Sequence, residues 1–324
     1  MSRMTIKEQV LGSPGIEKRR AADLANILER FAGAGKAIAR AVRRAALSGE
    51  TGYAGGANIT GDRQKKLDII GNQLVLDAVK QGGLVSGIVS EEDDLMVPTS
   101  TPDAPYVVCT DPIDGSSNTD INGPLGTIFS ICARRPGVAL PQGSDIVAAG
   151  YILYGPSTLL AFSVGSGAVG FTLDEEAGGF TLSHPALRCP KKGKTFSANL
   201  GRQREWHPNV HAYLDWVTDD DPATGRPYSL RYIGALVADL HRCFIEGGLY
   251  FYPADPKHKE GKLRMLYECA PLAFLAEQAG GRASNGVARI LDVPASAAHQ
   301  RSPLVIGSAD DVACFELFLK GETP

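Results

Sequence analysis

The chain has 324 residues, of which 44% are apolar and 21% are charged, and its formal net charge at pH 7 is −3. This composition is ordinary for a globular protein, and the slight negative charge argues against a nucleic-acid partner, which would require a basic field. The apolar runs are far shorter than the ~20 residues of a membrane helix, and the first residues, MSRMTIKEQV, lack the apolar core of a secretory signal. We therefore expect a cytoplasmic protein with no membrane or nucleic-acid partner.

The first half of the chain begins with helices and continues with strands. Apolar residues recur at helical spacing from Leu24 to Val42, with Gly33 and Gly35 as candidate kink points. A glycine-rich loop over 52–61 and a second helix from Leu67 to Ala78 follow. Strands are then expected in GLVSGIVS, YVVCT and LGTIFSICA, and residues 146–182 are typical of an antiparallel meander.

The second half alternates strands and helices. A basic, polar stretch around 190–193 indicates a boundary between an N-terminal domain, 1–187, and a C-terminal domain, 188–324. Beyond it we expect strands in FSANL, LYFYP and LVIG, and helices near 210–217, 235–246 and 263–278, with a last helix at the end. The order of elements predicts a layered α/β architecture with a large mixed sheet in each half. Six cysteines without a C-x-x-C pair favour reduced, buried thiols.

Acidic residues stand where two of these strands end. Glu91 and Glu92 follow GLVSGIVS, and Asp111 and Asp114 follow YVVC. Oxygen ligands without a nearby histidine or cysteine favour Mg²⁺ or Mn²⁺, and the spacing does not fit a calcium EF-hand. The turn 115–117, Gly-Ser-Ser, can hold a phosphate, so the pattern predicts metal-dependent hydrolysis of a phosphate ester. For the two aspartates alone, simple turn formation is the alternative, and the neighbouring glutamates disfavour it.

The segment DPIDGS at 111–116 resembles the signature of the metal-dependent, lithium-sensitive phosphatases, which include inositol monophosphatases. The narrower resemblance is to class I fructose-1,6-bisphosphatases, and its motifs run in order from about residue 50 to the end of the chain. They lie at 61–68, 90–93, 111–118, 126–129, 148–151, 153–155, 231–234, 237–242, 252–254, 261–269, 292–294 and 299–301. The resemblance implies the layered α-β-α-β-α sugar-phosphatase fold.

The resemblance also implies roles for individual residues. Two or three Mg²⁺ ions, or Mn²⁺ in their place, would be bound by Glu91, Glu92, Asp111, Asp114, Glu268 and the carbonyl of Ile113. The attacking water would be held and deprotonated by Asp62, Asp68 and Glu92. The reacting phosphate would be held by Gly115 and Ser116, with Asp114 and Ser117 also among the substrate-binding residues. The other phosphate would be held by Asn199, Tyr232, Tyr252 and Lys262, and by Arg231 from a neighbouring subunit.

The chain departs from the family pattern in three places. Where the family commonly has N-E-G-Y, this chain has Asn199-Leu200-Gly201-Arg202, so the geometry around Arg202 must differ. The residues with which animal members bind the inhibitor AMP are replaced, except for Tyr106, and we expect weak or absent AMP inhibition. The chloroplast enzyme has a cysteine-bearing insert where this chain has only the short segment 136–143. Because the insert is missing, we expect no thioredoxin switch.

We therefore expect a cytoplasmic homo-oligomer, a tetramer, that cleaves the 1-phosphate of the sugar bisphosphate fructose 1,6-bisphosphate. Activity on sedoheptulose 1,7-bisphosphate, alone or in addition, and activity on an inositol phosphate are the nearest alternatives. The phosphate-binding set at 231, 232 and 262 disfavours an inositol monophosphate. A non-catalytic sugar-phosphate sensor is the third reading, which the intact acidic positions disfavour. The sequence leaves a gluconeogenic and a carbon-fixing role equally open.

Overall fold

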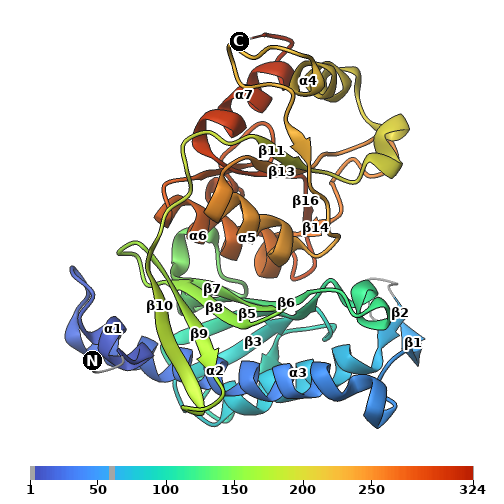
Figure 1. Cartoon of the computed structure of the whole chain (residues 1–324). Coiled ribbons are helices and arrows are strands. Elements are labelled where there is room, and N and C mark those ends of the chain that lie inside the picture. Colours follow the sequence, from blue (N-terminus) through green and yellow to red (C-terminus); the bar gives the residue numbers. More distant parts are fainter. Residues whose placement is uncertain (1–3, 58–62, 324) are drawn as a thin grey trace.

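The computed structural model describes residues 4–57 and 63–323, and these form five layers that alternate helices with sheets (Figure 1). The first sheet has eight strands in the order β10-β9-β8-β7-β6-β5-β3-β4. Its strands are β3 (Val85–Ser90), β4 (Val97–Pro98), β5 (Tyr106–Asp114), β6 (Leu125–Ala133), β7 (Ile146–Tyr154), β8 (Thr158–Ser163), β9 (Ala168–Asp174) and β10 (Gly179–Leu187). Of its neighbouring pairs, β3 with β5 is parallel and the others are antiparallel.

The second sheet has five strands in the order β12-β11-β13-β17-β15 and is also mixed. Its strands are β11 (Thr195–Ser197), β12 (Ser229–Leu230), β13 (Leu249–Tyr252), β15 (Arg282–Ser284) and β17 (Leu304–Gly307). Two small ribbons complete the strands: β1 (Tyr53–Ala57) with β2 (Arg63–Lys65), and β14 (Leu263–Arg264) with β16 (Arg301–Ser302). The expected architecture, with a mixed sheet in each half, is confirmed.

Helices cover both faces of both sheets. The outer layer on the first sheet contains α2 (Lys18–Ser48) and α3 (Lys66–Lys80), preceded by the short α1 (Ile6–Leu11). The middle layer contains α5 (Leu236–Glu246) and α6 (Ala270–Gln278), and the other outer layer contains α4 (Pro208–Thr218) and α7 (Ala309–Leu319). In the described part of the chain, none of the helices combines the length and apolar character that crossing a membrane requires.

The long helix α2 forms because its sequence supplies a capping residue at each end and an apolar face between them. The Glu17 carboxylate accepts hydrogen bonds from the first backbone N–H groups, and Gly49 ends the helix with φ of 72°. Leu24, Leu28 and Phe31 are fully buried, and the Phe31 ring stacks on Phe129 of β6 with centroids 4.1 Å apart. The helix runs on without a break through both of its internal glycines, so they do not split it into two helices. Burial of this apolar stripe outweighs the cost of about 1 kcal/mol per helical glycine.

The middle layer joins the two halves through one continuous apolar core. Tyr151 of β7 stacks on Phe244 of α5 with centroids 6.3 Å apart, and its hydroxyl lies 2.7 Å from His241 Nδ1. Burial lowers the pKa of His241 to about 4, which keeps its ring neutral at pH 7. All six cysteines are unpaired thiols, and five of them are buried, with Cys314 partly exposed.

One predicted element has a different structure. The expected helix over 263–278 begins only at Ala270, because residues 263–264 pair as a strand with β16 and Met265–Cys269 form one π-helical turn. A single π turn next to a helix is a common way to turn a functional side chain toward a site. Here it carries Glu268.

Candidate active site

The site begins where the parallel strands β3 and β5 end side by side. Ser90 pairs with Thr110, and the backbone N–H of Glu91 donates to the carbonyl of Thr110 at 3.1 Å. The chain therefore brings Glu91 and Glu92 next to Asp111, as the carboxyl ends of parallel strands meet at one edge. The strand β5 continues through an irregularity to Asp114, which places that carboxylate further along the same edge.

Glu91 and Asp111 are two carboxyl groups in direct contact inside the protein. They are close enough to share a hydrogen bond, which lowers the pKa of Glu91, whereas the hydrogen bond and the negative charge of Glu91 both raise the pKa of Asp111. Burial is the largest cause: together with the charge of Glu268 it raises the pKa of Glu91 to about 8, and it raises the pKa of Asp111 well above its usual range. Such crowded, buried carboxylates are costly unless a cation or a proton lies between them.

The second half of the chain supplies Glu268 and Arg264 to the same cluster. Both are buried, and the Glu268 carboxylate accepts the backbone N–H of Arg264. The Arg264 guanidinium lies 3.8 Å from a carboxylate oxygen of Glu91. From the spacing of four residues alone, Arg264 and Glu268 would be expected to form a surface ion pair on one helix. The structure contradicts this expectation, because both residues are buried, Arg264 belongs to β14 and Glu268 belongs to the π turn.

Asp114 links the cluster to the start of α5. Its two carboxylate oxygens accept the backbone N–H groups of Leu236 at 3.1 Å and Val237 at 2.7 Å. Burial raises the pKa of Asp114 to about 6, although both of these hydrogen bonds oppose the rise. The next residue, Gly115, has φ of 75°, and a Cβ there would lie 2.5 Å from Cβ of Ala235. Only glycine allows the two segments to approach so closely.

Asp68 lies at the start of α3, on the opposite wall of the site from α5. It is 4% exposed, and Oδ2 accepts the backbone N–H of Lys65 at 2.7 Å. Its other oxygen, Oδ1, is buried with no hydrogen-bond partner among the described residues. Burial, and after it the negative charge of Glu92, raises the pKa of Asp68 to about 7. A carboxyl group with a pKa near neutrality can both hold and release a proton at working pH.

The ribbon β1–β2 forms the rim of the site and is tied down by Asp120. The carboxylate of Asp120 accepts the backbone N–H of Gly52 at 2.9 Å and forms an ion pair with the buried Lys65. The Lys65 ammonium also lies 4.4 Å from the ring centroid of Tyr53. Asp62, expected to close over the site, lies outside the described residues. Sequence reasoning missed Asp120 and Tyr53, because neither carries a local signal.

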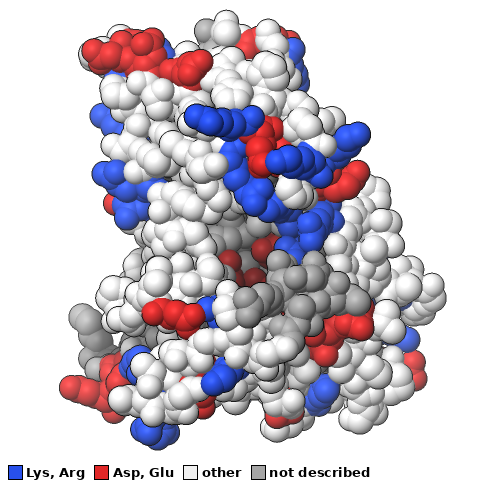
Figure 2. All heavy atoms as spheres, turned by 90° about the vertical axis from the view of Figure 1, so that its right-hand side faces the viewer, with Lys and Arg blue, Asp and Glu red and all other residues white. Residues whose placement is uncertain are grey.

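The acidic cluster, the Gly-Ser-Ser turn and the rim of the ribbon β1–β2 line a cavity of about 530 Å³. The expected residues that it brings together are Asp68, Glu91, Glu92, Asp111, Ile113, Asp114, Gly115, Ser116, Ser117 and Glu268, and they are joined by Tyr53, Gln64 and Lys65. Figure 2 looks toward this side of the molecule: acidic side chains appear in a hollow between the two halves, and lysines and arginines gather on the surface above it.

The residues expected to hold the second phosphate stand outside this cavity. Tyr252, at the end of β13, shares a hydrogen bond with the Asn199 side chain. Tyr232 is 40% exposed, and burial of its hydroxyl, then the proximity of Tyr252, raises its pKa to about 12. The positive charge of Arg202 acts on both tyrosines in the opposite direction. Both tyrosines therefore lie near Arg202. The negative charge of Asp114, which lines the acidic cavity, also contributes to the raised pKa of Tyr232.

Lys262 and Arg231 are the remaining residues that were expected to hold the second phosphate, and they lie in different environments. Lys262 is half-buried, and its carbonyl accepts a hydrogen bond from Arg264 Nη1 at 3.1 Å, which connects it to the acidic cluster. Arg231 is exposed and donates to the carbonyl of Leu230 at 2.8 Å. Its contact with a neighbouring subunit therefore stays a prediction.

The donor set fits a hard divalent cation. The charged groups of the donor set are all carboxylates: those of Asp68, Asp111, Asp114 and Glu268 are buried, and those of Glu91 and Glu92 are partly exposed. Asp68 also offers a buried oxygen without a hydrogen-bond partner among the described residues. In the described part of the chain no three such side chains close around one point as a finished metal-binding group. Glu268 and Asp114 are instead held by backbone N–H groups. Binding of a cation would thus compete with these hydrogen bonds for the carboxylate oxygens.

A layered α/β fold with such a cavity beside a Gly-Ser-Ser turn defines a phosphoric monoester hydrolase. The chain belongs to the class 1 fructose-1,6-bisphosphatase family: its residues 4–185 match the family model "Fructose-1-6-bisphosphatase, N-terminal domain", and residues 189–320 match the model of the C-terminal domain. The family is one of divalent-metal-dependent enzymes of carbohydrate metabolism.

Similar proteins cover almost the whole chain. A class 1 fructose-1,6-bisphosphatase of Acaryochloris marina is 50% identical over 307 residues, which is 92% of each chain. That of Chlorobium phaeobacteroides is 43% identical over 331 residues, covering 99% of this chain and 100% of the relative. Among solved structures, Leishmania major fructose-1,6-bisphosphatase in its holo form superimposes with a TM-score of 0.91 at 35% identity, covering 99% of this chain and 100% of that chain.

Proposed function

We propose that this protein hydrolyses the 1-phosphate of fructose 1,6-bisphosphate to give fructose 6-phosphate and phosphate. The observation that carries the proposal is the acidic cavity, in which carboxylates from both halves of the chain meet the Gly-Ser-Ser turn. The matching relatives, which carry the name of this activity over nearly their full length, support the choice of substrate.

The metal in this proposal is Mg²⁺, with two or three ions per subunit, and Mn²⁺ as a substitute. Glu91, Glu92, Asp111, Glu268, Asp114 and the carbonyl of Ile113 would hold it. When bound, it would supply positive charge to the phosphoryl oxygens and to the attacking water. The crowding of buried carboxylates with raised pKa values supports this assignment, because a divalent cation removes their mutual repulsion.

The residues of the chain then orient and deprotonate the water. Asp68 and Glu92 face the same cavity, and the negative charge of Glu92 helps to raise the pKa of Asp68 to about 7, after the larger effect of burial. Asp68 can therefore accept the proton of the water as it attacks phosphorus in line with the departing sugar oxygen. Gly115, Ser116 and Ser117 hold the reacting phosphate through backbone N–H and hydroxyl groups. Asp62, which precedes β2 in the sequence, would help to hold the water.

The second phosphate of the substrate would lie between Arg202, Tyr232 and Tyr252, with Asn199 and Lys262 beside them. Arg202 forms an ion pair with Glu205 at 3.0 Å, and Lys257 reaches the same glutamate at 2.6 Å. Glu205 therefore orients the guanidinium beside the two tyrosines, where the family's own tyrosine is missing. A planar guanidinium can bind a phosphate through two hydrogen bonds.

We further propose a cytoplasmic homotetramer in which the exposed Arg231 reaches the second phosphate of a neighbouring subunit. The two domains would meet between residues 187 and 188, a boundary supported by the end of β10 at Leu187 and by family matches that stop and resume there.

The test is phosphate release by the Mg²⁺-loaded protein from fructose 1,6-bisphosphate, sedoheptulose 1,7-bisphosphate and inositol 1-phosphate in parallel. We expect release from the first and little from the third, because an inositol monophosphate has no second phosphate for Arg202 and Tyr232. Comparable release from the second would make the protein a dual sugar bisphosphatase. Binding of all three without turnover would contradict the proposal and indicate a sensor.

A further inference from the structure

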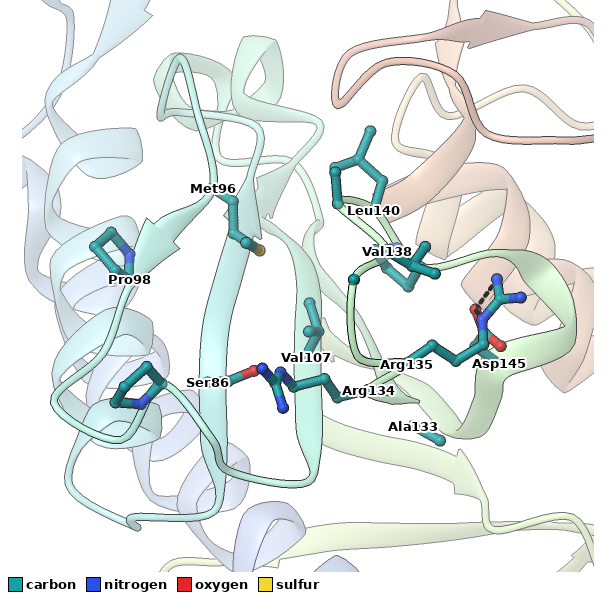
Figure 3. Close-up of a pocket in the computed structure, with 14 residues that line it drawn as sticks. Ser86, Met96, Pro98, Val107, Ala133, Arg134, Arg135, Val138, Leu140 and Asp145 are labelled. Carbon is teal, nitrogen blue, oxygen red and sulfur yellow. Dashed lines mark hydrogen bonds and ion pairs between the residues drawn. The ribbon is translucent and has the colours of Figure 1, made fainter.

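A second cavity, of about 280 Å³, lies on the first sheet at the side of β3 and β4 (Figure 3). Its floor is formed by Ser86 of β3, Val107 of β5 and Ala133 at the end of β6. The other lining residues are Met96, Pro98, Pro102, Arg134, Arg135, Gly137, Val138, Ala139, Leu140, Pro141 and Asp145. Among the described residues, none that lines it also lines the acidic cavity. It is therefore a separate site on the same sheet.

The lining of this cavity combines apolar walls with one positive charge. Met96, Val107, Val138 and Leu140 supply apolar surface, and two arginines and one aspartate supply charge. Arg135 and Asp145 neutralise each other, with 2.8 Å between Nη2 and the carboxylate. Figure 3 shows Arg134 lying across the floor toward Ser86, whereas Arg135 points away toward Asp145.

The positive charge that remains, on Arg134, has only a distant carboxylate partner. Its guanidinium lies 3.5 Å from Asp103, whose side chain is 93% exposed. This distance exceeds the ~2.8 Å of a good charge-assisted hydrogen bond, and water screens the pair. The Arg134 side chain is 30% exposed, so an anion in the cavity could displace Asp103 at little cost.

The wall of the cavity is part of the chain segment that carries Glu91 and Glu92. This segment is anchored at its start by the Glu91 N–H and at its end by Thr99, whose hydroxyl donates to the carbonyl of Val85 at 2.6 Å. Between these anchors Met96 lies directly over β3, where a Cβ on Gly87 would be 2.7 Å from its sulfur. A ligand against Met96 and Pro98 therefore touches the segment that begins with two active-site carboxylates.

We propose that this cavity binds a small organic anion, a carboxylate or phosphate on an apolar body, and that the bound anion rigidifies residues 91–99. The anionic group pairs with Arg134, and the apolar body lies against Met96, Val107 and Leu140. Burial of apolar surface together with one charge-assisted pair gives specificity for amphipathic anions over neutral or purely polar molecules.

The probe is 3-phenylpropionate, with the uncharged 3-phenylpropan-1-ol as its matched control. Binding to the Mg²⁺-loaded protein is measured by calorimetry, and the exchange of backbone amides over 85–99 by mass spectrometry. For a ligand of this size we expect a dissociation constant on the order of 1 mM. Arg134→Gln should weaken binding about tenfold, and the exposed Arg44→Gln should leave it unchanged. Val138→Trp, which fills the cavity, should abolish binding.

Slower amide exchange over 85–99 with the acid, absent in Arg134→Gln, would support the proposal. Equal binding of the acid by wild type and Arg134→Gln would overturn it, as would equal binding of the acid and the alcohol. No saturation up to 20 times the expected constant, or protection only around the acidic cavity, would overturn it as well. None of these readouts depends on turnover, so they are independent of the proposed phosphatase activity.

Discussion

Asp68 illustrates how the environment of one side chain in this protein suits the role that we propose for it. The same aspartate at the surface would have a pKa near 4 and would be a poor proton acceptor at neutral pH. Burial at the start of α3, followed by the charge of Glu92, raises its pKa to about 7. The ability of Asp68 to accept a proton near neutral pH thus comes from its environment, which is formed by the start of α3 and by Glu92 after the end of β3.

Replacement of Asp68 by asparagine removes the proton acceptor and keeps the shape. We predict a loss of kcat of about 10²- to 10⁴-fold, with KM changed little, in steady-state assays of phosphate release. Asp77→Asn, an exposed aspartate on the same helix that binds Gln73, is the matched control and should retain activity. A kcat within threefold of wild type in Asp68→Asn would show that another group takes the proton.

Arg202 is one of the residues at which this chain departs from the expected family pattern. We propose that its guanidinium binds the second phosphate in place of the tyrosine hydroxyl of that pattern. We predict that Arg202→Ala raises KM for fructose 1,6-bisphosphate about tenfold, because one charge-assisted contact is lost, with a smaller effect on kcat. Arg204→Ala, two residues further and exposed, is the control. An unchanged KM in Arg202→Ala would place the second phosphate elsewhere.

At the scale of elements, short apolar runs bounded by turn residues were sufficient to predict most of the longer strands. LGTIFSICA coincides with β6, and the meander has its turns where glycines predict them. The π turn that carries Glu268 could not be predicted, because its five residues also fit a helix and only the pairing of β14 with β16 delays the helix. Long-range contacts such as those of Asp120 and Arg134 likewise have no local signal.

Asp120 makes two contacts that hold the ribbon β1–β2 over the cavity, one to the backbone N–H of Gly52, just before β1, and one to Lys65 of β2. Asp120→Ala should therefore release the ribbon and leave the buried Lys65 ammonium without this partner. We predict that amide exchange over residues 49–57 accelerates severalfold, because the ribbon opens more often once these contacts are lost. The melting temperature should change little. Asp215→Asn on α4 is the control, and unchanged exchange in Asp120→Ala would contradict this role.

At the scale of the whole molecule, stability and metal binding are coupled through the buried carboxylates. Their pKa values in the folded state, about 6 for Asp114, about 7 for Asp68 and about 8 for Glu91, exceed the values of about 4 in an unfolded chain. Between these limits the folded state binds more protons than the unfolded state. The free energy of unfolding of the metal-free protein therefore falls as pH rises through 6 to 8.

We predict that the melting temperature of the metal-stripped protein falls by several degrees from pH 6 to pH 8.5, and that saturating Mg²⁺ removes most of this fall. Each pKa unit corresponds to about 1.4 kcal/mol, and about 1 kcal/mol moves the melting temperature by about 2–4 °C in large domains. Differential scanning calorimetry in metal-free and Mg²⁺-containing buffers measures both. Glu91→Gln should flatten the pH dependence, and an equally steep fall in this variant would contradict the assignment.

The proposed function requires above all that the acidic cavity hold the divalent cation on which hydrolysis depends. The most direct measurement is phosphate release from fructose 1,6-bisphosphate by metal-stripped protein during a Mg²⁺ titration, for wild type, Glu91→Gln and the exposed Glu175→Gln. We predict no release without metal, equal curves for wild type and Glu175→Gln, and at least a tenfold higher Mg²⁺ requirement or no activity for Glu91→Gln. Full activity in a chelating buffer, or a Glu91→Gln curve that matches wild type, would contradict the claim.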